Sequence, residues 1–168
     1  ELINALKIVN GGHITINKMT GSWAGAMGQC QFMPSSFINY ATDWDKDGSK
    51  NIWTSKPDVF ASAANYLKRV GWSNQITWGR KVFIGNYNGK TDEKKYNLLS
   101  YWASKGILKA NKDNLPNVKV KARLIIPDGY KKYGYLAYKN FDSLLNWNRS
   151  NYFAIAVGTL ADYIKENN

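Results

Sequence analysis

Three aspartates alternate with other residues in one short loop, at Asp43, Asp45 and Asp47, and Gly48 follows them. Side chains on alternate residues can converge on one hard cation when a glycine permits the tight bend. The spacing fits the first half of an EF-hand loop, for which calcium is the natural ion. Three carboxylates this close together also repel one another in the absence of a cation. The loop therefore predicts a calcium site.

The second half of the EF-hand pattern is incomplete. Its twelfth position is Thr54, where an EF-hand places a bidentate Glu. We expect the carbonyl group of Ser49 and the side chain of Asp58, the nearest downstream carboxylate, to complete the ligand set. The alternative is a solvated, aspartate-rich turn without a metal. Nothing near the loop resembles an activated water or a nucleophile, so the predicted role of the ion is structural.

Acid–base chemistry has few candidates in this chain. The only Glu residues are Glu1, Glu93 and Glu166, and none lies in the apolar setting that a glycosidic general acid needs. His13 is the sole histidine, and a lone loop histidine is more often a packing or surface residue than a catalytic one. No His or Lys adjoins Ser22 in the sequence, which argues against a serine hydrolase. We therefore assign no catalytic residue to this chain.

The segment from Gly21 to Ser36 places a few polar side chains among small residues, with aromatic and Met residues beside them. Ser22 and Gln31 are the most informative of these, because a polar side chain among apolar neighbours must be hydrogen-bonded to something. Together with the loop that follows, up to Asp58, this segment resembles the core of the membrane-bound lytic murein transglycosylase B family. Two further matches follow in order, residues 64–72 and residues 148–150 with the helix after them.

The resemblance implies a lytic transglycosylase that cleaves the bond between N-acetylmuramic acid and N-acetylglucosamine in peptidoglycan and leaves 1,6-anhydromuramoyl products. In that family the catalytic Glu sits in a Glu-Ser/Thr-x-aromatic-Gly motif, upstream of the point that corresponds to Glu1. The motif is absent from residues 1–168. We therefore expect the chain to lack the N-terminal part with the general acid, to provide the cleft walls, and to be inactive alone.

The resemblance also assigns substrate-binding residues. Ser22 and Gln31 would be polar groups near the acid and the sugar, Phe32 would form a wall, and Tyr66 would reach the cleft. Asn148 would hydrogen-bond the reacting sugar.

Two aromatic residues depart from the family's pattern. Trp147 stands where the family more often shows Tyr, and Phe153 stands where Tyr is frequent, which removes any role for a hydroxyl group there. Core packing is the alternative for each aromatic residue.

The net charge of the chain indicates which classes of partner it could bind. Twenty-three Lys and Arg against twelve Asp and Glu give a formal charge of +11, which favours an anionic partner. The resemblance indicates peptidoglycan strands in the periplasm or cell envelope of a bacterium, and a monomer. Membrane association would require the missing N-terminal segment. A non-catalytic peptidoglycan-binding module is the alternative function, and a nucleic-acid binder ranks far below because no binding motif is present.

The predicted fold is α+β, a lysozyme-like helical core with an inserted small α/β lobe and the EF-hand-like calcium loop. In residues 1–72, the core with the calcium loop, helices are predicted from Leu2 to a stop at Gly11, from a cap at Ser35 or Ser36 to Tyr40, and from a cap at Ser55 to a stop at Gly71.

The inserted lobe is predicted to span residues 73–140. Strands are expected at 82–84 and 118–126, with an antiparallel return at 133–138 after a turn at 127–129, and a helix at 96–102. Residues 141–168 are predicted to return to the core as its closing segment, ending in a buried apolar helix.

Overall fold

The structure is a computed structural model that describes residues 1–89, 95–127 and 132–167. Its internal contacts divide the chain into two compact units, Glu1–Val70 and Gly71–Asn168. The expected closing segment, 141–168, groups with residues 71–140 by this measure, while the division into a core and an inserted lobe stays a prediction. No helix among the described residues is long and apolar enough to cross a membrane.

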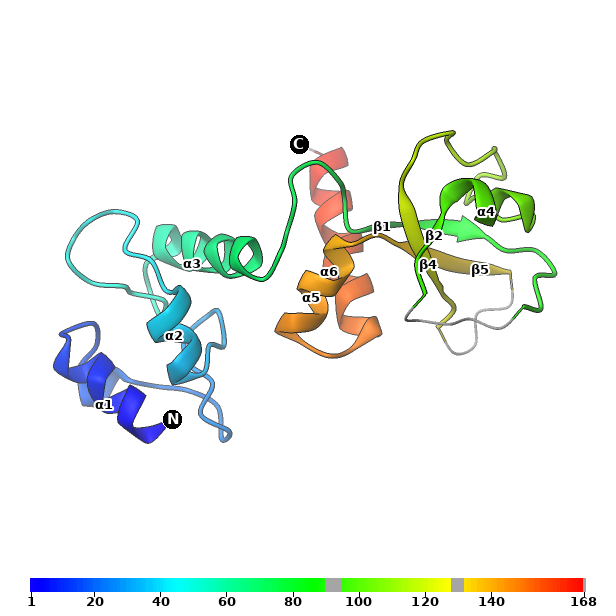
Figure 1. Ribbon diagram of the computed structural model, residues 1–168. Helices are drawn as coiled ribbons and strands as arrows, with labels where there is room; N and C mark the ends of the chain where they lie inside the picture. Colours follow the sequence, from blue (N-terminus) through cyan, green and yellow to red (C-terminus); the bar gives the residue numbers. More distant parts are fainter. Residues whose placement is uncertain (90–94, 128–131, 168) are drawn as a thin grey trace. The chain divides into compact units, whose positions relative to one another are not determined.

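The first unit is built from helices and long connecting loops (Figure 1). Its elements are α1 (Leu2–Asn10), the 3-10 helix η1 (Ile16–Lys18), α2 (Pro34–Tyr40) and α3 (Lys56–Arg69). Helix α2 contacts both α1 and α3. The buried side chains include Ile8 from α1, Phe37 from α2 and Ile52 from the loop before α3.

The predicted boundaries of α1 and α3 are confirmed. Helix α1 ends just before Gly11, whose N–H donates to the carbonyl oxygen of Lys7 at 2.9 Å. Helix α3 begins after Ser55, whose hydroxyl group accepts from the N–H of Asp58 at 3.4 Å. Gly71 follows α3 with φ +105°, a conformation that favours glycine and terminates the helix.

The predicted serine cap of α2 is wrong. Pro34 occupies the first turn, so Ser35 is already inside the helix, and the residue at the cap position makes no side-chain hydrogen bond. The cap comes instead from Glu1, whose carboxylate accepts from the N–H of Ser35 at 2.8 Å and from its hydroxyl group at 2.6 Å. A carboxylate at this end of a helix accepts from an N–H group that has no partner inside the helix, and its negative charge is favourable there.

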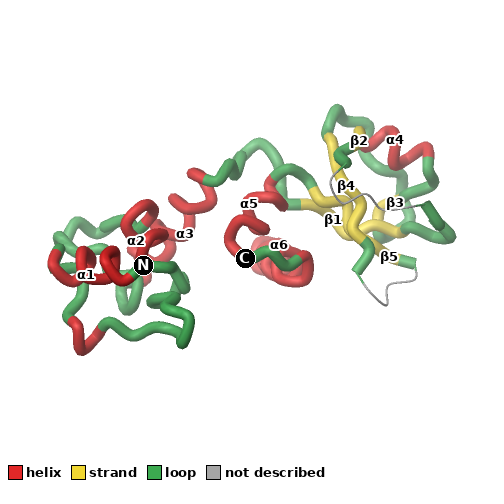
Figure 2. The backbone as a smooth tube through the Cα atoms, turned by 60° about the horizontal axis from the view of Figure 1, so that its bottom comes forward, coloured by secondary structure: helices red, strands yellow, loops and turns green. Residues whose placement is uncertain are grey.

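The second unit contains a five-stranded antiparallel sheet with strand order β2-β4-β5-β1-β3 (Figure 2). The strands are β1 (Gly79–Phe83), β2 (Asn97–Leu98), β3 (Leu108–Lys109), β4 (Lys121–Ile125) and β5 (Tyr133–Ala137). The predicted pairing of β4 with β5 is confirmed, with Leu124 opposite Leu136. Part of the predicted turn at 127–129 lies outside the described residues.

Helix α4 (Leu99–Ser104) contributes to the core of this sheet. Leu99 and Trp102 are buried together with Val82, Leu124 and Leu136 from the central strands. The helix begins three residues later than the predicted 96, because Asn97 and Leu98 pair with β4 instead.

Helices α5 (Asn140–Trp147) and α6 (Asn151–Glu166) complete the second unit and contact each other. Asn140 is fully buried and fixes the start of α5: its side-chain oxygen accepts from the N–H of Ser73 at 2.8 Å, and its amide group donates to the carbonyl oxygens of Ser73 and Ile76.

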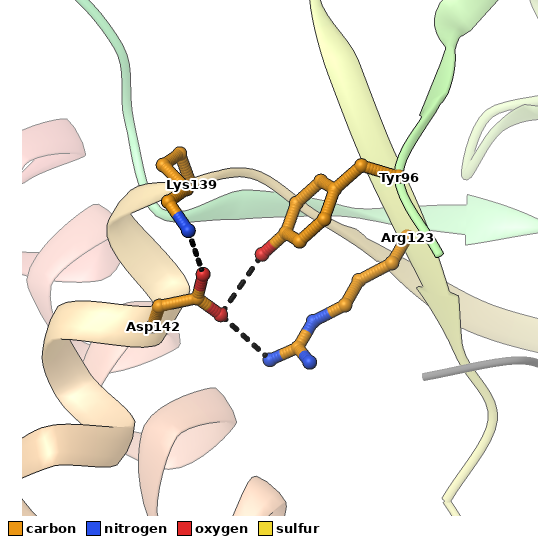
Figure 3. Close-up of polar contacts among 4 residues, drawn as sticks. All are labelled: Tyr96, Arg123, Lys139 and Asp142. Atoms are coloured by element: carbon orange, nitrogen blue, oxygen red, sulfur yellow. Dashed lines mark hydrogen bonds and ion pairs between the residues drawn. The ribbon is translucent and has the colours of Figure 1, made fainter. Parts of the chain in front are cut away.

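Asp142, in the first turn of α5, connects that helix to the sheet (Figure 3). Its carboxylate accepts from the hydroxyl group of Tyr96 at 2.9 Å and pairs with Arg123 at 3.1 Å and Lys139 at 2.6 Å. Burial raises the pKa of Tyr96, so the phenol stays protonated and donates to this carboxylate.

The prediction that α6 is buried is wrong for most of the helix. Burial is confined to the side with Ala154, Ile155 and Gly158, while Leu160 and Tyr163 are exposed. The reason is that only one side of α6 packs against the rest of the second unit, where Gly158 lies against the ring of Trp78. The indole N–H of Trp78 donates to Asp162 of α6 at 2.9 Å.

Candidate functional site

The aspartates of the loop between α2 and α3 lie together, as their spacing predicts. Asp43, Asp45 and Asp47 each offer a carboxylate oxygen, and these oxygens lie within 4.8 Å of one another. Backbone N–H groups hold two of the side chains in place: Gly48 donates to Asp43 at 3.0 Å and Ser49 donates to Asp47 at 2.8 Å. Gly48 has φ +92°, which the bend of the loop requires.

The arrangement suits a hard cation. Oδ1 of Asp43 is buried and has no hydrogen-bond partner among the residues that the structure describes. A buried carboxylate oxygen without a partner is costly, and a cation held by the three carboxylates would remove that cost.

The side chains of Asp58 and Ser49, the two residues expected to supply further ligands, make hydrogen bonds in this structure. Asp58 is fully buried, and its two oxygens accept from the N–H groups of Trp44 at 2.7 Å and Asn51 at 2.8 Å, which joins the two sides of the loop. The hydroxyl group of Ser49 donates to the carbonyl oxygen of His13 at 3.1 Å. Ligation by Asp58 and by the Ser49 carbonyl stays a prediction.

A hollow of about 820 Å³ opens in the first unit beside this loop, and Gln31 lines it. Gln31 has φ +50°, an unusual backbone conformation for a residue with a side chain, and its amide group donates to the carbonyl oxygen of Gly28 at 2.9 Å. Thr20, Gln29 and Trp53 also line the hollow. Their polar groups give it hydrogen-bonding capacity, and the indole gives it an aromatic side.

Sequence reasoning did not identify Gln29 and Trp53. The amide group of Gln29 donates to the carbonyl oxygen of Trp53, and the indole N–H of Trp53 donates to that of Thr20, each at 2.9 Å. These bonds join segments 24 and 33 residues apart, so no local spacing signalled them. The one available signal was the position of Trp53 next to the aspartate loop.

His13 also lines the hollow, as a packing residue. Its ring lies 5.6 Å from that of Phe37, and its Nδ1 accepts from the N–H of Lys50 at 3.3 Å. Partial burial and the nearby Lys50 charge lower the pKa of His13, so the neutral imidazole is favoured. This agrees with the expectation that a lone histidine here packs against the fold.

The structure does not place Ser22 in the same hollow as Gln31. Ser22 lines a smaller one, of about 320 Å³, and its hydroxyl group accepts from the N–H of Ala26 at 3.2 Å. Phe32 is only 3% exposed, and its ring lies 5.7 Å from that of Tyr66. The ring of Tyr66 also packs on Tyr40, at 4.8 Å. Phe32 thus packs against Tyr66. The binding roles of Ser22, Gln31, Phe32 and Tyr66 stay predictions.

The remaining predicted site residues belong to the second unit, at the junction of α5 and α6. Trp147 ends α5, and Asn148 follows it with an exposed side chain. Ser150 caps the start of α6, and its hydroxyl group accepts from the N–H of Phe153 at 3.3 Å. Trp147 and Phe153 are half-buried. The convergence of these residues with Gln31 stays a prediction.

Comparison with known proteins identifies the family. Residues 1–162 match the transglycosylase SLT domain. The chain is 35% identical over 154 residues to membrane-bound lytic murein transglycosylase B of Escherichia coli K12, an alignment that covers 87% of this chain and 40% of that enzyme.

Solved structures agree with this match. SltB3 from Pseudomonas aeruginosa, in complex with NAG-anhNAM-pentapeptide, has a TM-score of 0.90 and 39% identity over 98% of this chain and 45% of its own. Escherichia coli Slt35, in complex with calcium, has a TM-score of 0.79 and 30% identity over 99% of this chain and 52% of its own. The chain thus spans about half or less of the length of these relatives. With its helices and antiparallel sheet in the lysozyme-like fold of these enzymes, the chain belongs to the transglycosylase SLT domain family.

Proposed function

We propose that this chain is the glycan-binding part of a peptidoglycan lytic transglycosylase of the bacterial cell envelope. The observation that carries the proposal is the hollow lined by Gln31, Gln29 and Trp53, in a chain whose relative SltB3 was solved with NAG-anhNAM-pentapeptide. A hollow with a few convergent polar groups and an aromatic ring is suited to a sugar. Ser22, Phe32, Tyr66, Trp147, Asn148 and Phe153 are the further proposed contacts, from the resemblance to the family.

The described carboxylates support the view that the general acid lies outside this chain. Hydrogen bonds from Ser35 lower the pKa of Glu1, whereas a general acid at neutral pH needs a raised pKa. Glu166 is exposed at the end of α6. Glu93 lies outside the described residues. The proposed acid is the Glu of the family's motif, which residues 1–168 do not contain.

The reaction that we propose needs one carboxyl group. The acid protonates the glycosidic oxygen as the bond to C1 of N-acetylmuramic acid breaks, and the acetamido group of that sugar assists. The C6 hydroxyl group then bonds to C1, and its proton returns to the same carboxylate. No water is consumed, so no second carboxylate is required to activate one.

We further propose that Asp43, Asp45 and Asp47 bind one calcium ion, with the Ser49 carbonyl and Asp58 as additional ligands. The ion would offset most of the negative charge of the three carboxylates and hold the loop beside the Gln31 hollow. The test is thermal unfolding with calcium or with EGTA. Calcium should raise the melting temperature of the parent chain and have a much smaller effect on Asp45→Asn, with Asp113→Asn as the matched control. An unchanged melting temperature of the parent chain on addition of calcium would contradict the proposed calcium site.

The glycan-binding function is tested by sedimentation of the chain with purified peptidoglycan sacculi. The chain should sediment with sacculi, and Gln31→Ala and Trp53→Ala should reduce the bound fraction, while exposed Asn39→Ala should not. A non-catalytic binding module is the second candidate, since the chain holds the hollow without the acid. It would be favoured if the native polypeptide carried no upstream Glu motif.

A further inference from the structure

The second unit contains a hollow of its own, of about 650 Å³. It lies between the segment 84–89, which follows β1, and the end of α4 with the turn after it. Its side chains include Asn86, Tyr87, Asn88, Tyr101 and Lys105. None of these residues belongs to the candidate site in the first unit.

Two tyrosine rings are anchored in this hollow by one buried residue. The ring of Tyr101 lies 5.1 Å from that of Trp102 and the ring of Tyr87 lies 6.5 Å from it, both edge-on. Trp102 is itself fixed, because its indole N–H donates to the carbonyl oxygen of Ala122 at 2.9 Å. Tyr101 nevertheless remains 42% exposed. A rigid, accessible aromatic ring is suited to stacking on the apolar face of a sugar.

Hydrogen-bonding groups and a positive charge surround these rings. The side chains of Asn86 and Asn88 are exposed, and their amide groups have no partner among the described residues. Nζ of Lys105 lies 5.6 Å from the centre of the Tyr101 ring. An amide group can both donate to and accept from an acetamido group, and an ammonium group attracts a carboxylate.

The charge of the whole unit points to the same class of ligand. Residues 71–168 carry sixteen Lys and Arg against seven Asp and Glu, whereas residues 1–70 carry seven against five. The excess charge of the protein is therefore concentrated in the unit that contains this hollow. A basic unit attracts anionic ligands over long distances.

We propose that this hollow is a second glycan-binding site, which takes an N-acetylated sugar whose attached peptide carries carboxylates, as in peptidoglycan strands. The choice of ligand rests on the proposed function. Tyr101 stacks on the sugar ring, Asn86 and Asn88 bind the acetamido group, and Lys105 binds the carboxylate. Such a site would hold a strand independently of the Gln31 hollow.

The test is an NMR titration of the whole 15N-labelled chain. The two ligands are triacetylchitotriose and NAG-NAM-pentapeptide. Both ligands should shift the amide signals of residues 84–89 and 101–106 in a saturable way. Ligand concentrations of up to about 10 mM are high enough to approach saturation of a weak site with a dissociation constant of about 1 mM. The carboxylate-bearing ligand should bind about threefold to fivefold more tightly, and Lys105→Gln should remove that difference.

Matched variants identify the ring that carries the contact. Tyr101→Ala should weaken binding at these signals by about tenfold, while Tyr101→Phe, which keeps the stacking ring and the fold, should bind normally. Unshifted signals with both ligands would overturn the proposal. Equal binding of the ligands by the parent chain and by Tyr101→Ala would also overturn it. A parallel titration with RNA or heparin would overturn it if only these polyanions shifted the signals, because the surface would then be purely electrostatic.

The same titration separates this site from the proposed function. Gln31→Ala should abolish shifts around residues 28–31 and leave those of 84–89 and 101–106 unchanged. Shifts confined to the second unit would contradict the role of the Gln31 hollow and support this site. Shifts confined to the first unit would support the role of the Gln31 hollow and contradict this second site.

Discussion

At the scale of single residues, Asp58 is the side chain on which the aspartate loop most depends. It is fully buried, and its two oxygens accept from backbone N–H groups at Trp44 and Asn51, on either side of the glycine bend. The same residue stands in the first turn of α3, where a negative charge is favourable. One carboxylate thus fixes both the loop and the start of the next helix.

Asp58→Asn should therefore destabilise the protein by about 2–4 kcal/mol, because an amide can accept only one of the two N–H bonds and leaves the other donor unpaired. The measurement is urea unfolding in the presence of EGTA, which separates this effect from any loss of calcium. Asp113→Asn, at an exposed carboxylate, is the control. Equal stability of the two variants would show that Asp58 does not hold the loop.

Cys30 is a second residue whose surroundings determine its chemistry. It is 5% exposed, its thiol group donates to the carbonyl oxygen of Val59 at 3.4 Å, and burial raises its pKa to about 11. The thiolate form is therefore scarce at pH 8. We expect alkylation of the folded chain at pH 8 to be about a hundredfold slower than that of the chain in urea. Equal rates in the two conditions would mean that the thiol is accessible.

At the scale of elements, the contact between α6 and Trp78 fixes the closing helix to the residue just before β1. Gly158 lies against the indole ring, and a Cβ atom there would overlap its atoms. The indole N–H also donates to Asp162, one turn further along the helix. Close approach of helix and ring thus requires glycine at 158.

Gly158→Ala should destabilise the second unit by about 1–3 kcal/mol, because overpacking outweighs the gain in helix propensity of about 1 kcal/mol. Thermal unfolding followed by tryptophan fluorescence measures the change. Thr159→Ala, at an exposed neighbouring position, should leave the melting temperature almost unchanged. A Gly158→Ala variant as stable as the parent chain would show that α6 can move away from Trp78 at little cost.

Local sequence signals predicted the elements whose ends are encoded locally. The glycines after α1 and α3, the Ser55 cap and the alternation in β4 were sufficient. The cap of α2 was not predictable in this way, because Glu1 supplies it from 34 residues away. Helix α5 and strands β2 and β3 were also missed. The two strands contain two residues each, too short for a recognisable alternation, and depend on pairing with distant strands.

The same distinction applies to the candidate site. The aspartate cluster was predicted because its spacing is local and its chemistry is specific. The shape of the Gln31 hollow was not, since Gln29, Trp53 and Thr20 come together through tertiary hydrogen bonds. Residue roles taken from the family resemblance indicated Gln31 and Ser22, but they could not show that these two residues line different hollows.

At the scale of the whole molecule, two units divide the properties of the protein. The first carries the aspartate loop and the Gln31 hollow with a nearly balanced charge, and the second carries most of the excess positive charge. The proposed glycan sites, one in each unit, together with this positive charge would suit an anionic polymer that is bound at more than one point.

The central claim, that this chain binds peptidoglycan but does not hold the catalytic acid, is tested most directly by mass spectrometry of the soluble products released from purified sacculi. Loss of a positioned general acid lowers a rate by about a hundredfold to ten-thousandfold. We predict that the 168-residue chain sediments with sacculi and releases no 1,6-anhydromuropeptides above the level of a buffer control. Release of anhydro-ended products at an appreciable rate by this chain alone would contradict the claim, because Glu1, Glu93, Glu166 or an aspartate would then have to be the acid.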